Sequence, residues 1–310
     1  MLRLKSTKWR ASLALVLVCV CLALASLSRT AEPASFSGAR AFEDLKHLVG
    51  FGPRPSGSQA LTQTRQWLIQ ELQAAGAEVE EDPFVGDTPI GPIPMDNLIA
   101  KFRGSGRQTV IVAGHYDTKR FDQFRFVGAN DGGSSAALLV ELARVLAAKR
   151  HALNYWLVFF DGEEAVRPQW AGTDNTYGSR HLVEKLSASG ELSRIRALIL
   201  VDMIGAAQLR IPREEGSTTW LNDLVFGVAQ RLGYGKVFAG SQGTIADDHM
   251  PFIDAGVSAV DLIDFDYGPN NSYWHTAKDT LDHCSPQSLA IVGRVVAASL
   301  DELEKSSPKK

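Results

Sequence analysis

Polar residues that could bind a metal or transfer protons recur directly after short apolar runs of this sequence. They are His115 and Asp117 after residues 109–113, Glu163 and Glu164 after residues 155–160, and Asp202 after residues 197–201. A single Asp or Glu in such a place is more often a helix cap or a turn residue. Their recurrence on successive units predicts that these side chains meet in one site.

Histidine and carboxylate side chains together are suitable zinc ligands. Zinc in a catalytic site binds three protein ligands and keeps a fourth position open. His275, combined with carboxylates from Asp131, Glu164 or Asp202, would supply such a set without any cysteine. Glu163 and Glu164 are adjacent, so one can bind the metal while its neighbour acts as general acid or base. These residue types therefore favour metal-assisted chemistry.

The elements that must position these residues alternate between short apolar runs and longer amphipathic segments. We expect strands at residues 109–113, 155–160, 197–201 and 258–263, and helices at residues 41–48, 61–75, 134–148, 179–186, 221–232 and 286–303. This alternation predicts an α/β fold in which a mostly parallel mixed β-sheet is sandwiched between helices, with ligands bound at the carboxyl ends of the strands. Residues 82–95 contain four prolines and are expected to form a loop. Asp279 and Asp282 are expected to cap or precede the last helix.

Composition bounds the size of the folded body and excludes one class of partner. The chain has 310 residues, of which 45% are hydrophobic and 22% are charged, as in ordinary globular proteins. We expect one catalytic domain, residues 38–306, with a single core. The formal net charge of −3 leaves no sustained basic stripe of the kind that neutralises phosphates, so nucleic acid is not an expected partner.

The first 31 residues have the features of an export segment. Four basic residues, Arg3, Lys5, Lys8 and Arg10, precede an uninterrupted run of 17 apolar or small residues. We expect residues 1–31 to be a signal peptide or an N-terminal membrane anchor, and residues 32–37 to be a linker. Either alternative predicts an exported protein, periplasmic or secreted, with membrane contact only through such an anchor. Because Cys19 and Cys21 lie in this segment, the folded domain keeps only Cys284, and no internal disulfide is expected.

Seven motifs follow one another along the chain. They are Gly-His-Tyr-Asp-Thr-Lys at 114–119, Phe-Val-Gly-Ala-Asn-Asp at 126–131, Phe-Phe-Asp-Gly-Glu-Glu-Ala at 159–165, Tyr-Gly-Ser-Arg-His-Leu at 177–182, Val-Asp-Met-Ile-Gly-Ala at 201–206, Asp-Asp-His-Met-Pro-Phe at 247–252 and Trp-His-Thr at 274–276. In this order they resemble the motifs of the zinc enzymes that include glutaminyl cyclases and bacterial zinc aminopeptidases. The resemblance covers the chain from about residue 40 onward and implies the α/β/α fold of zinc aminopeptidases.

Within this group, the sequence resembles glutaminyl cyclases at several positions. Asp247, Trp274, Trp170 and the stretch Lys119-Arg120-Phe121 are similar to cyclases, whereas the loop at 130–135 is similar to aminopeptidases. The cyclase resemblance implies conversion of the N-terminal glutamine of peptides or proteins to pyroglutamate, with release of ammonia. The same resemblance implies one zinc ion held by Asp131, Glu164 and His275, and acid/base catalysis by Glu163. It also implies that Asp202 and Asp247 form a hydrogen-bonding acid pair. Trp170 and Trp274 would belong to an aromatic wall of the substrate site.

The alternative is a zinc aminopeptidase that hydrolyses N-terminal residues with two zinc ions. It would use the same three ligands for one ion, and His115 and Asp202 for the second, bridged by Asp131, with Asp117 behind His115. Two other classes have less support. A non-catalytic domain would be expected to have lost ligands or the acid/base, and no Gly-x-Ser-x-Gly motif favours a serine hydrolase.

Overall fold

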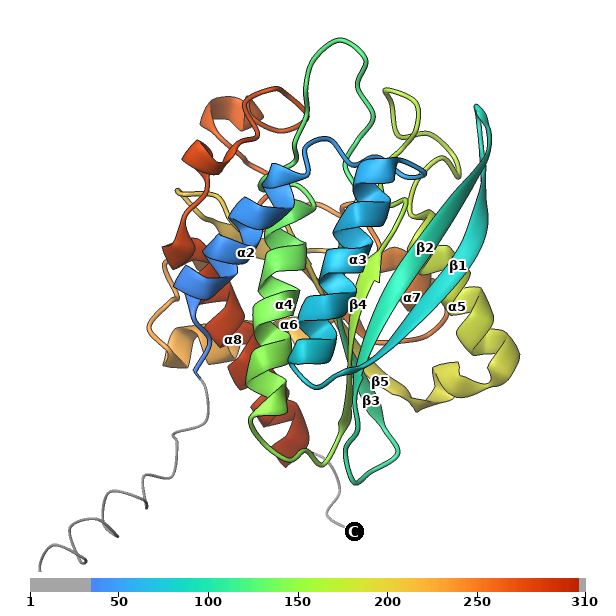
Figure 1. Cartoon of the computed structure of the whole chain (residues 1–310). Coiled ribbons are helices and arrows are strands. Elements are labelled where there is room, and N and C mark those ends of the chain that lie inside the picture. The colour runs from blue at the N-terminus through green and yellow to red at the C-terminus, as the bar shows by residue number, and fades with distance from the viewer. Residues whose placement is uncertain (1–34, 307–310) are drawn as a thin grey trace, which may run out of the picture. The chain divides into compact units, whose positions relative to one another are not determined.

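The computed structural model describes residues 35–306, drawn as the coloured ribbon in Figure 1. The predicted export segment, residues 1–31, lies outside the described residues, as does the first half of the predicted linker, residues 32–34. Packed structure begins inside that linker, because Phe36 is buried and Ser37 caps the helix α2 (Gly38–Gly50). Within residues 35–306, no helix combines the length and the hydrophobicity needed to cross a bilayer.

A six-stranded sheet forms the centre of the fold, with the strand order β1-β2-β4-β3-β5-β8. Its strands are β1 (Glu78–Thr88), β2 (Gly91–Phe102), β3 (Thr109–His115), β4 (Asn154–Phe160), β5 (Ile195–Asp202) and β8 (Ala259–Ile263). Strands β3, β4, β5 and β8 are parallel to one another, and β2 is antiparallel to both β1 and β4. The predicted mostly parallel mixed sheet and its four predicted strands are therefore confirmed.

Helices cover both faces of this sheet (Figure 1). One layer contains α2, α3 (Gln59–Ala74), α4 (Gly133–Ala147), α6 (Thr219–Arg231) and α8 (Pro286–Lys305), and the other contains α5 (Tyr177–Ser189) and α7 (Met250–Asp254). Successive strand residues point to opposite faces. In β3, Val110 and Val112 pack with the first layer, and Ile111 and Ala113 pack with the second. The predicted sandwich of helices around the sheet is confirmed.

The prediction of a loop at residues 82–95 is wrong, because this stretch forms the hairpin of β1 and β2. Proline has no N–H to donate to a neighbouring strand, so it is tolerated where one side of its strand faces no other strand. Pro83 lies in β1, which is the edge of the sheet. Pro92 and Pro94 lie in the part of β2 that pairs with β1 alone, since β2 contacts β4 only at residues 98–102. Each of these prolines therefore has a free strand side, where its missing N–H costs no sheet hydrogen bond.

Several short elements were not predicted. They are the two-stranded parallel sheet of β6 (Ile211–Glu214) and β7 (Phe238–Gln242), the helix α7, and the 3-10 helices η1 (Glu191–Arg194), η2 (Pro269–Asn271) and η3 (Leu281–His283). Elements of three to five residues are too short to give a periodic hydrophobic pattern. One of them matters for the site, because the turn before α7 carries Asp247.

Candidate active site

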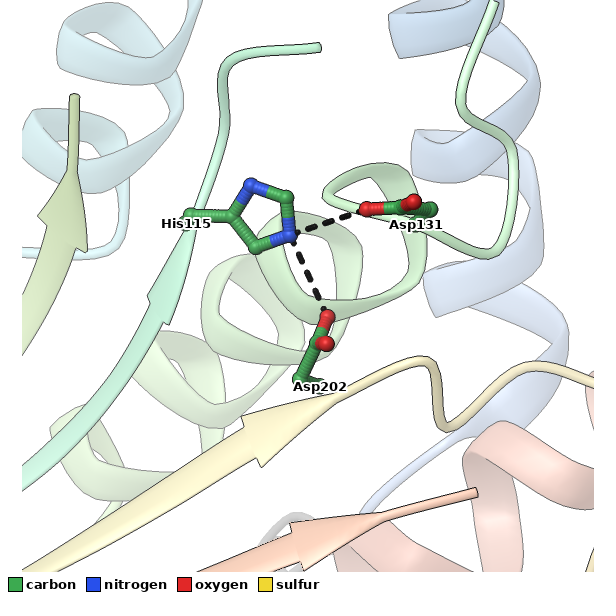
Figure 2. Close-up of side chains that lie close together, drawn as sticks. All are labelled: His115, Asp131 and Asp202. Atoms are coloured by element: carbon green, nitrogen blue, oxygen red, sulfur yellow. Dashed lines mark hydrogen bonds and ion pairs between the residues drawn. The ribbon is translucent and has the colours of Figure 1, made fainter. Parts of the chain in front are cut away.

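The predicted site residues meet at the carboxyl edge of the parallel strands. His115 is the last residue of β3, and Asp202 is the last residue of β5. Asp131 comes from the loop before α4, and Figure 2 shows its carboxylate and that of Asp202 both facing the ring of His115. Because parallel strands end at the same edge, residues far apart in the sequence converge there.

One group of three potential metal ligands consists of Asp131, Glu164 and His275. One nitrogen or oxygen atom from each lies within 4.8 Å of the other two. His275 Nε2 is 2.9 Å from Glu164 Oε1 and 3.3 Å from Asp131 Oδ2. Asp131 Oδ2 is buried and makes no hydrogen bond within residues 35–306. An imidazole and two carboxylates with an unsatisfied buried oxygen fit the ligand chemistry of zinc.

A second group, His115, Asp131 and Asp202, lies beside the first. His115 Nε2 is 3.2 Å from Asp131 Oδ1 and 3.2 Å from Asp202 Oδ1 (Figure 2). Asp117 Oδ1 lies 3.3 Å from His115 Nδ1, which places Asp117 behind His115 as expected. Asp131 belongs to both groups, one oxygen facing each histidine. The ligand sets predicted for one zinc and for two are thus both assembled.

The electrostatics of the two histidines follow from these carboxylates. Burial acts to lower the pKa of His275, but Glu164 and Asp131 outweigh it and raise this pKa to about 9. The pKa of His115 is likewise raised well above its ordinary value, because Glu163 and the carboxylates bonded to the ring outweigh the effect of burial. Both rings therefore face sites that strongly favour positive charge, as expected where a cation binds.

Glu163 is buried next to both ligand groups. Its Oε2 lies 3.6 Å from His115 Nδ1. The turn that carries Glu163 and Glu164 is held by Asp117, whose two oxygens accept from the backbone N–H groups of these residues at 3.4 Å each. Burial, assisted by the charges of Glu164 and Asp247 and opposed by His115, raises the pKa of Glu163 well above its usual range. A carboxyl group with such a raised pKa is suited to proton transfer.

Asp202 and Asp247 line the same cavity. Asp202 Oδ1 accepts from Met203 N at 2.7 Å, and Asp247 Oδ1 accepts from Asp248 N at 2.6 Å. Asp247 Oδ2 is buried and has no hydrogen-bond partner within residues 35–306, so this atom forms no direct bond to Asp202. Burial and then the charge of Asp202 raise the pKa of Asp247 to about 7. The two carboxylates thus interact through their charges.

The cavity beside these residues has a volume of about 490 Å³ and combines an acidic floor with an aromatic wall. The wall includes Trp170 and Trp274, as predicted, and also Phe265 and Ile245. The ring of Trp274 stacks on that of His275 with 4.0 Å between centroids, and lies 4.9 Å from the ring of Phe265. Phe265 and Ile245 were missed because isolated apolar residues in loops carry no pattern that separates them from core residues.

Asp279 precedes the last helix, which is one of the two predicted alternatives, but it does not cap that helix. Its side chain is buried, and its two oxygens accept from Asn130 N at 2.7 Å and Asp131 N at 3.1 Å. The cap of α8 is Ser285, which accepts from two N–H groups of the first turn. A serine just before a proline-initiated helix is a common cap, and this signal was available in the sequence.

Two buried cations close to the ligands were also not predicted as functional. Lys119 Nζ donates to Ala165 O at 2.9 Å and lies 3.5 Å from Glu164 Oε2. Arg54 comes from the turn before α3 and donates to three backbone carbonyl oxygens around the loop that carries Asp131. Nothing in the sequence distinguishes Arg54 from an exposed arginine in a Gly/Pro-rich turn.

Comparisons with known proteins show what this chain is similar to. A sequence profile of peptidase family M28 matches residues 97–300. The glutaminyl-peptide cyclotransferase of Drosophila melanogaster is 32% identical over 274 residues, which cover 79% of this chain and 76% of that protein. The crystal structure of an Acidobacteriales bacterium glutaminyl cyclase has a TM-score of 0.85 and 37% identity, and covers 90% of this chain and 98% of that chain. A Zn-dependent exopeptidase from Parabacteroides distasonis shares the fold, with a TM-score of 0.79, 24% identity and coverage of 88% and 99%.

Proposed function

This chain belongs to peptidase family M28, and we propose that it is a zinc-dependent glutaminyl-peptide cyclotransferase. Its substrates are peptides or proteins whose N-terminal glutamine is converted to pyroglutamate with release of ammonia. The observation that carries the proposal is that one cavity is lined both by Glu163 with the ligand group Asp131, Glu164 and His275, and by Trp274. The likeness to glutaminyl-peptide cyclotransferases selects this reaction among those of the family.

The proposed zinc ligands are Asp131, Glu164 and His275. Their atoms lie within 4.8 Å of one another, and Asp131 Oδ2 is left without a hydrogen bond within the described residues. When bound there, zinc supplies a Lewis acid that polarises the γ-carboxamide carbonyl of the substrate. One zinc ion per chain is sufficient for this reaction, because the nucleophile is the substrate's own α-amine and no water has to be activated.

Glu163 is the proposed acid/base. The α-nitrogen of the substrate forms a bond to the γ-carboxamide carbon, and the bond from that carbon to the amide nitrogen breaks. Glu163 accepts a proton from the attacking amine and donates it to the departing ammonia. Burial raises the pKa of Glu163, which makes its carboxylate a stronger base than an exposed glutamate and suits it to accept the proton of the attacking amine.

Asp202 and Asp247 are proposed to carry one proton in total beside the leaving group, coupled by their charges rather than by a direct hydrogen bond. Two like charges in a buried site disfavour double ionisation, and the charge of Asp202 contributes to the raised pKa of Asp247. The tryptophans would provide the walls of the substrate site. Trp274 and Trp170 line the cavity, where their rings form a large rigid apolar surface.

The second candidate function is a two-zinc aminopeptidase. The observation in its favour is the group of His115, Asp131 and Asp202, whose ligand atoms also lie within 4.8 Å of one another. A second ion there would provide the metal-bound water that peptide hydrolysis requires. The ligand geometry alone does not separate the two functions, because both groups are complete.

One experiment separates the two candidates. The purified chain is incubated with a Gln-initiated peptide and with a Leu-initiated peptide of otherwise equal sequence, and the products are identified by mass spectrometry. We expect loss of ammonia from the first peptide and no change in the second. Release of free leucine would instead support the aminopeptidase. Metal analysis of the same sample should give one zinc per chain for the cyclase and two for the aminopeptidase.

Export of the protein is part of the proposal. The basic and then apolar residues of 1–31 support it, and both a signal peptide and an anchor would place the catalytic domain outside the cytosol. Fractionation of cells that produce the full chain, followed by N-terminal sequencing, tests this. A cleaved N-terminus near residue 31 supports a signal peptide, an intact membrane-bound chain supports an anchor, and an intact cytosolic chain contradicts export.

A further inference from the structure

The loop that carries Asp131, residues 127–131, is held on one side by Arg54. The Arg54 side chain is fully buried, with 0% exposure. Its Nη1 donates to Val127 O at 2.6 Å, and its Nη2 donates to Gly128 O at 2.9 Å. Its Nε donates to Tyr116 O at 2.9 Å. A single guanidinium thus bonds the Asp131 loop to the residue that follows His115.

The same loop is held by Asp279 through its N–H groups. Asp279 Oδ1 accepts from Asn130 N at 2.7 Å, and Asp279 Oδ2 accepts from Asp131 N at 3.1 Å. The hydroxyl of Tyr267 donates to Oδ1 at 3.1 Å. A buried guanidinium group therefore binds the carbonyl groups of the loop, while a buried carboxyl group binds its amides. The two residues are far apart in the sequence, and each satisfies backbone groups that would otherwise be unpaired.

Each of these residues also contacts a segment that carries another residue of the site. The backbone of Arg54 pairs with Thr118, through Arg54 N to Thr118 Oγ1 at 3.0 Å and Thr118 N to Arg54 O at 3.2 Å. This pairing supports the segment that begins at His115. Asp279 lies four residues after His275, and its own N–H donates to Thr276 O at 3.1 Å. Asp279 therefore couples the loop of His275 to the loop of Asp131.

The Asp131 loop depends on such external support because of its glycines. Gly128 and Gly132 have φ values of 50° and 76°, in the left-handed region that glycine favours. A Cβ on Gly128 would collide with the carbonyl oxygen of Asp131. The glycines permit the tight approach of the loop to the site, but they also leave the free chain many other conformations.

We propose that Arg54 and Asp279 are positioning residues that preform the zinc site, so that zinc affinity depends on them although neither binds the metal. This inference rests on the proposed ligands Asp131, Glu164 and His275. Loss of an outer partner that orients a ligand typically weakens metal binding by about 10-fold to 100-fold. We expect a change of that size when either residue loses its hydrogen bonds to the loop.

Two conservative variants remove these bonds with little change in volume. In Asp279→Asn, either orientation of the amide places its NH₂ group against Asn130 N–H or Asp131 N–H, so one donor faces another donor. In Arg54→Lys, the positive charge remains, but one ammonium group cannot reproduce the guanidinium fork that reaches three separate carbonyl groups.

Matched controls come from a partly buried cluster of charged residues in the C-terminal half of α4. Glu141 has 0% exposure and accepts from Ser37 N at 2.9 Å, so Glu141→Gln removes a buried carboxylate that holds backbone, away from the ligands. Arg144 pairs with Asp44 and Glu71, and Arg144→Lys is the control for Arg54→Lys. A merely structural role predicts that all four variants lower the melting temperature while leaving zinc affinity unchanged.

The experiment measures the zinc dissociation constant of the metal-free full chain by competition with a chromophoric chelator. Circular dichroism checks that each variant is folded at the temperature used. We expect Asp279→Asn and Arg54→Lys to weaken zinc binding about tenfold or more, and both controls to stay within about twofold of the wild type. If Asp279→Asn is not folded, Arg54→Lys decides the outcome.

The outcomes separate this inference from the ligand assignment. Zinc affinity within about twofold of the wild type in folded Asp279→Asn and Arg54→Lys would overturn the inference alone. Equal weakening in the control variants would overturn it as well, because the effect would then follow general destabilisation. A wild-type chain that binds no zinc would overturn the ligand assignment together with the inference.

Discussion

Glu214 is expected to make a large, pH-dependent contribution to stability. It is buried at the end of β6, and its carboxylate contacts the turn that carries Asp247 both before and after that residue. Its carboxylate contacts are Ser217 Oγ at 2.7 Å, Gly216 N at 2.8 Å, Ile245 N at 3.0 Å and His249 Nε2 at 3.3 Å. Two of these partners, Ile245 and His249, lie two residues before and two residues after Asp247.

The magnitude follows from the pKa of this group. Burial acts to raise the pKa of Glu214, but the bonds from His249, Ser217 and the two N–H groups outweigh it and lower the pKa from 4.5 to about 2. This lowering of the pKa corresponds to about 3 kcal/mol of folding stability at neutral pH. Because the folded-state pKa is depressed, this stability is present above the unfolded pKa near 4.5 and is lost as the pH falls toward about 2.

The perturbation is Glu214→Gln, and the assay is urea unfolding of the metal-free chain at several pH values. We expect the wild type to exceed the variant by about 3 kcal/mol near pH 5 and above, and by about 2 kcal/mol near pH 3.5. Glu215→Gln is the matched control, because Glu215 is the exposed neighbour in the sequence and its change should cost less than about 0.5 kcal/mol at every pH. A wild-type advantage that is constant across this pH range, or smaller than about 1 kcal/mol at neutral pH, would refute the reasoning.

Three further predictions concern the reaction. Glu163→Gln should lower kcat by about 10²-fold to 10⁴-fold while the zinc content stays at the wild-type level, and ammonia release with metal analysis measures both quantities. Burial and the charge of Asp202 raise the pKa of Asp247 to about 7, so it is protonated below and ionised above that pH. The pH–rate profile of the wild type should therefore show an inflection near pH 7 that Asp247→Asn lacks, and an unchanged profile would contradict the shared proton. Trp274→Ala should raise KM for a Gln-initiated peptide about tenfold, since it removes the ring that lines the cavity, and an unaltered KM would exclude Trp274 from substrate binding.

The sequence predicted which residues form strands and helices better than it predicted which strands lie next to one another. The four parallel strands and the six longer helices follow from hydrophobic patterns, because each pattern spans enough residues to show a period. The hairpin of β1 and β2 was missed because its prolines suggested a loop, and only the strand order shows that they lie on sides without a neighbour. Sequence patterns do not show where the edge of a sheet falls.

The sequence by itself determined the chemical character of the site. It placed His115, Asp202 and the Glu163-Glu164 pair at the ends of strands, and parallel strands bring such ends to one edge. Tertiary structure alone decided how these side chains are held. Arg54 binds backbone carbonyl groups, which every residue has, and Asp279 binds backbone N–H groups, which every residue except proline has. The residue types of their partners therefore do not reveal these contacts in the sequence. Such contacts depend on the distance between segments that lie far apart in the chain, and they exist only once the chain has folded.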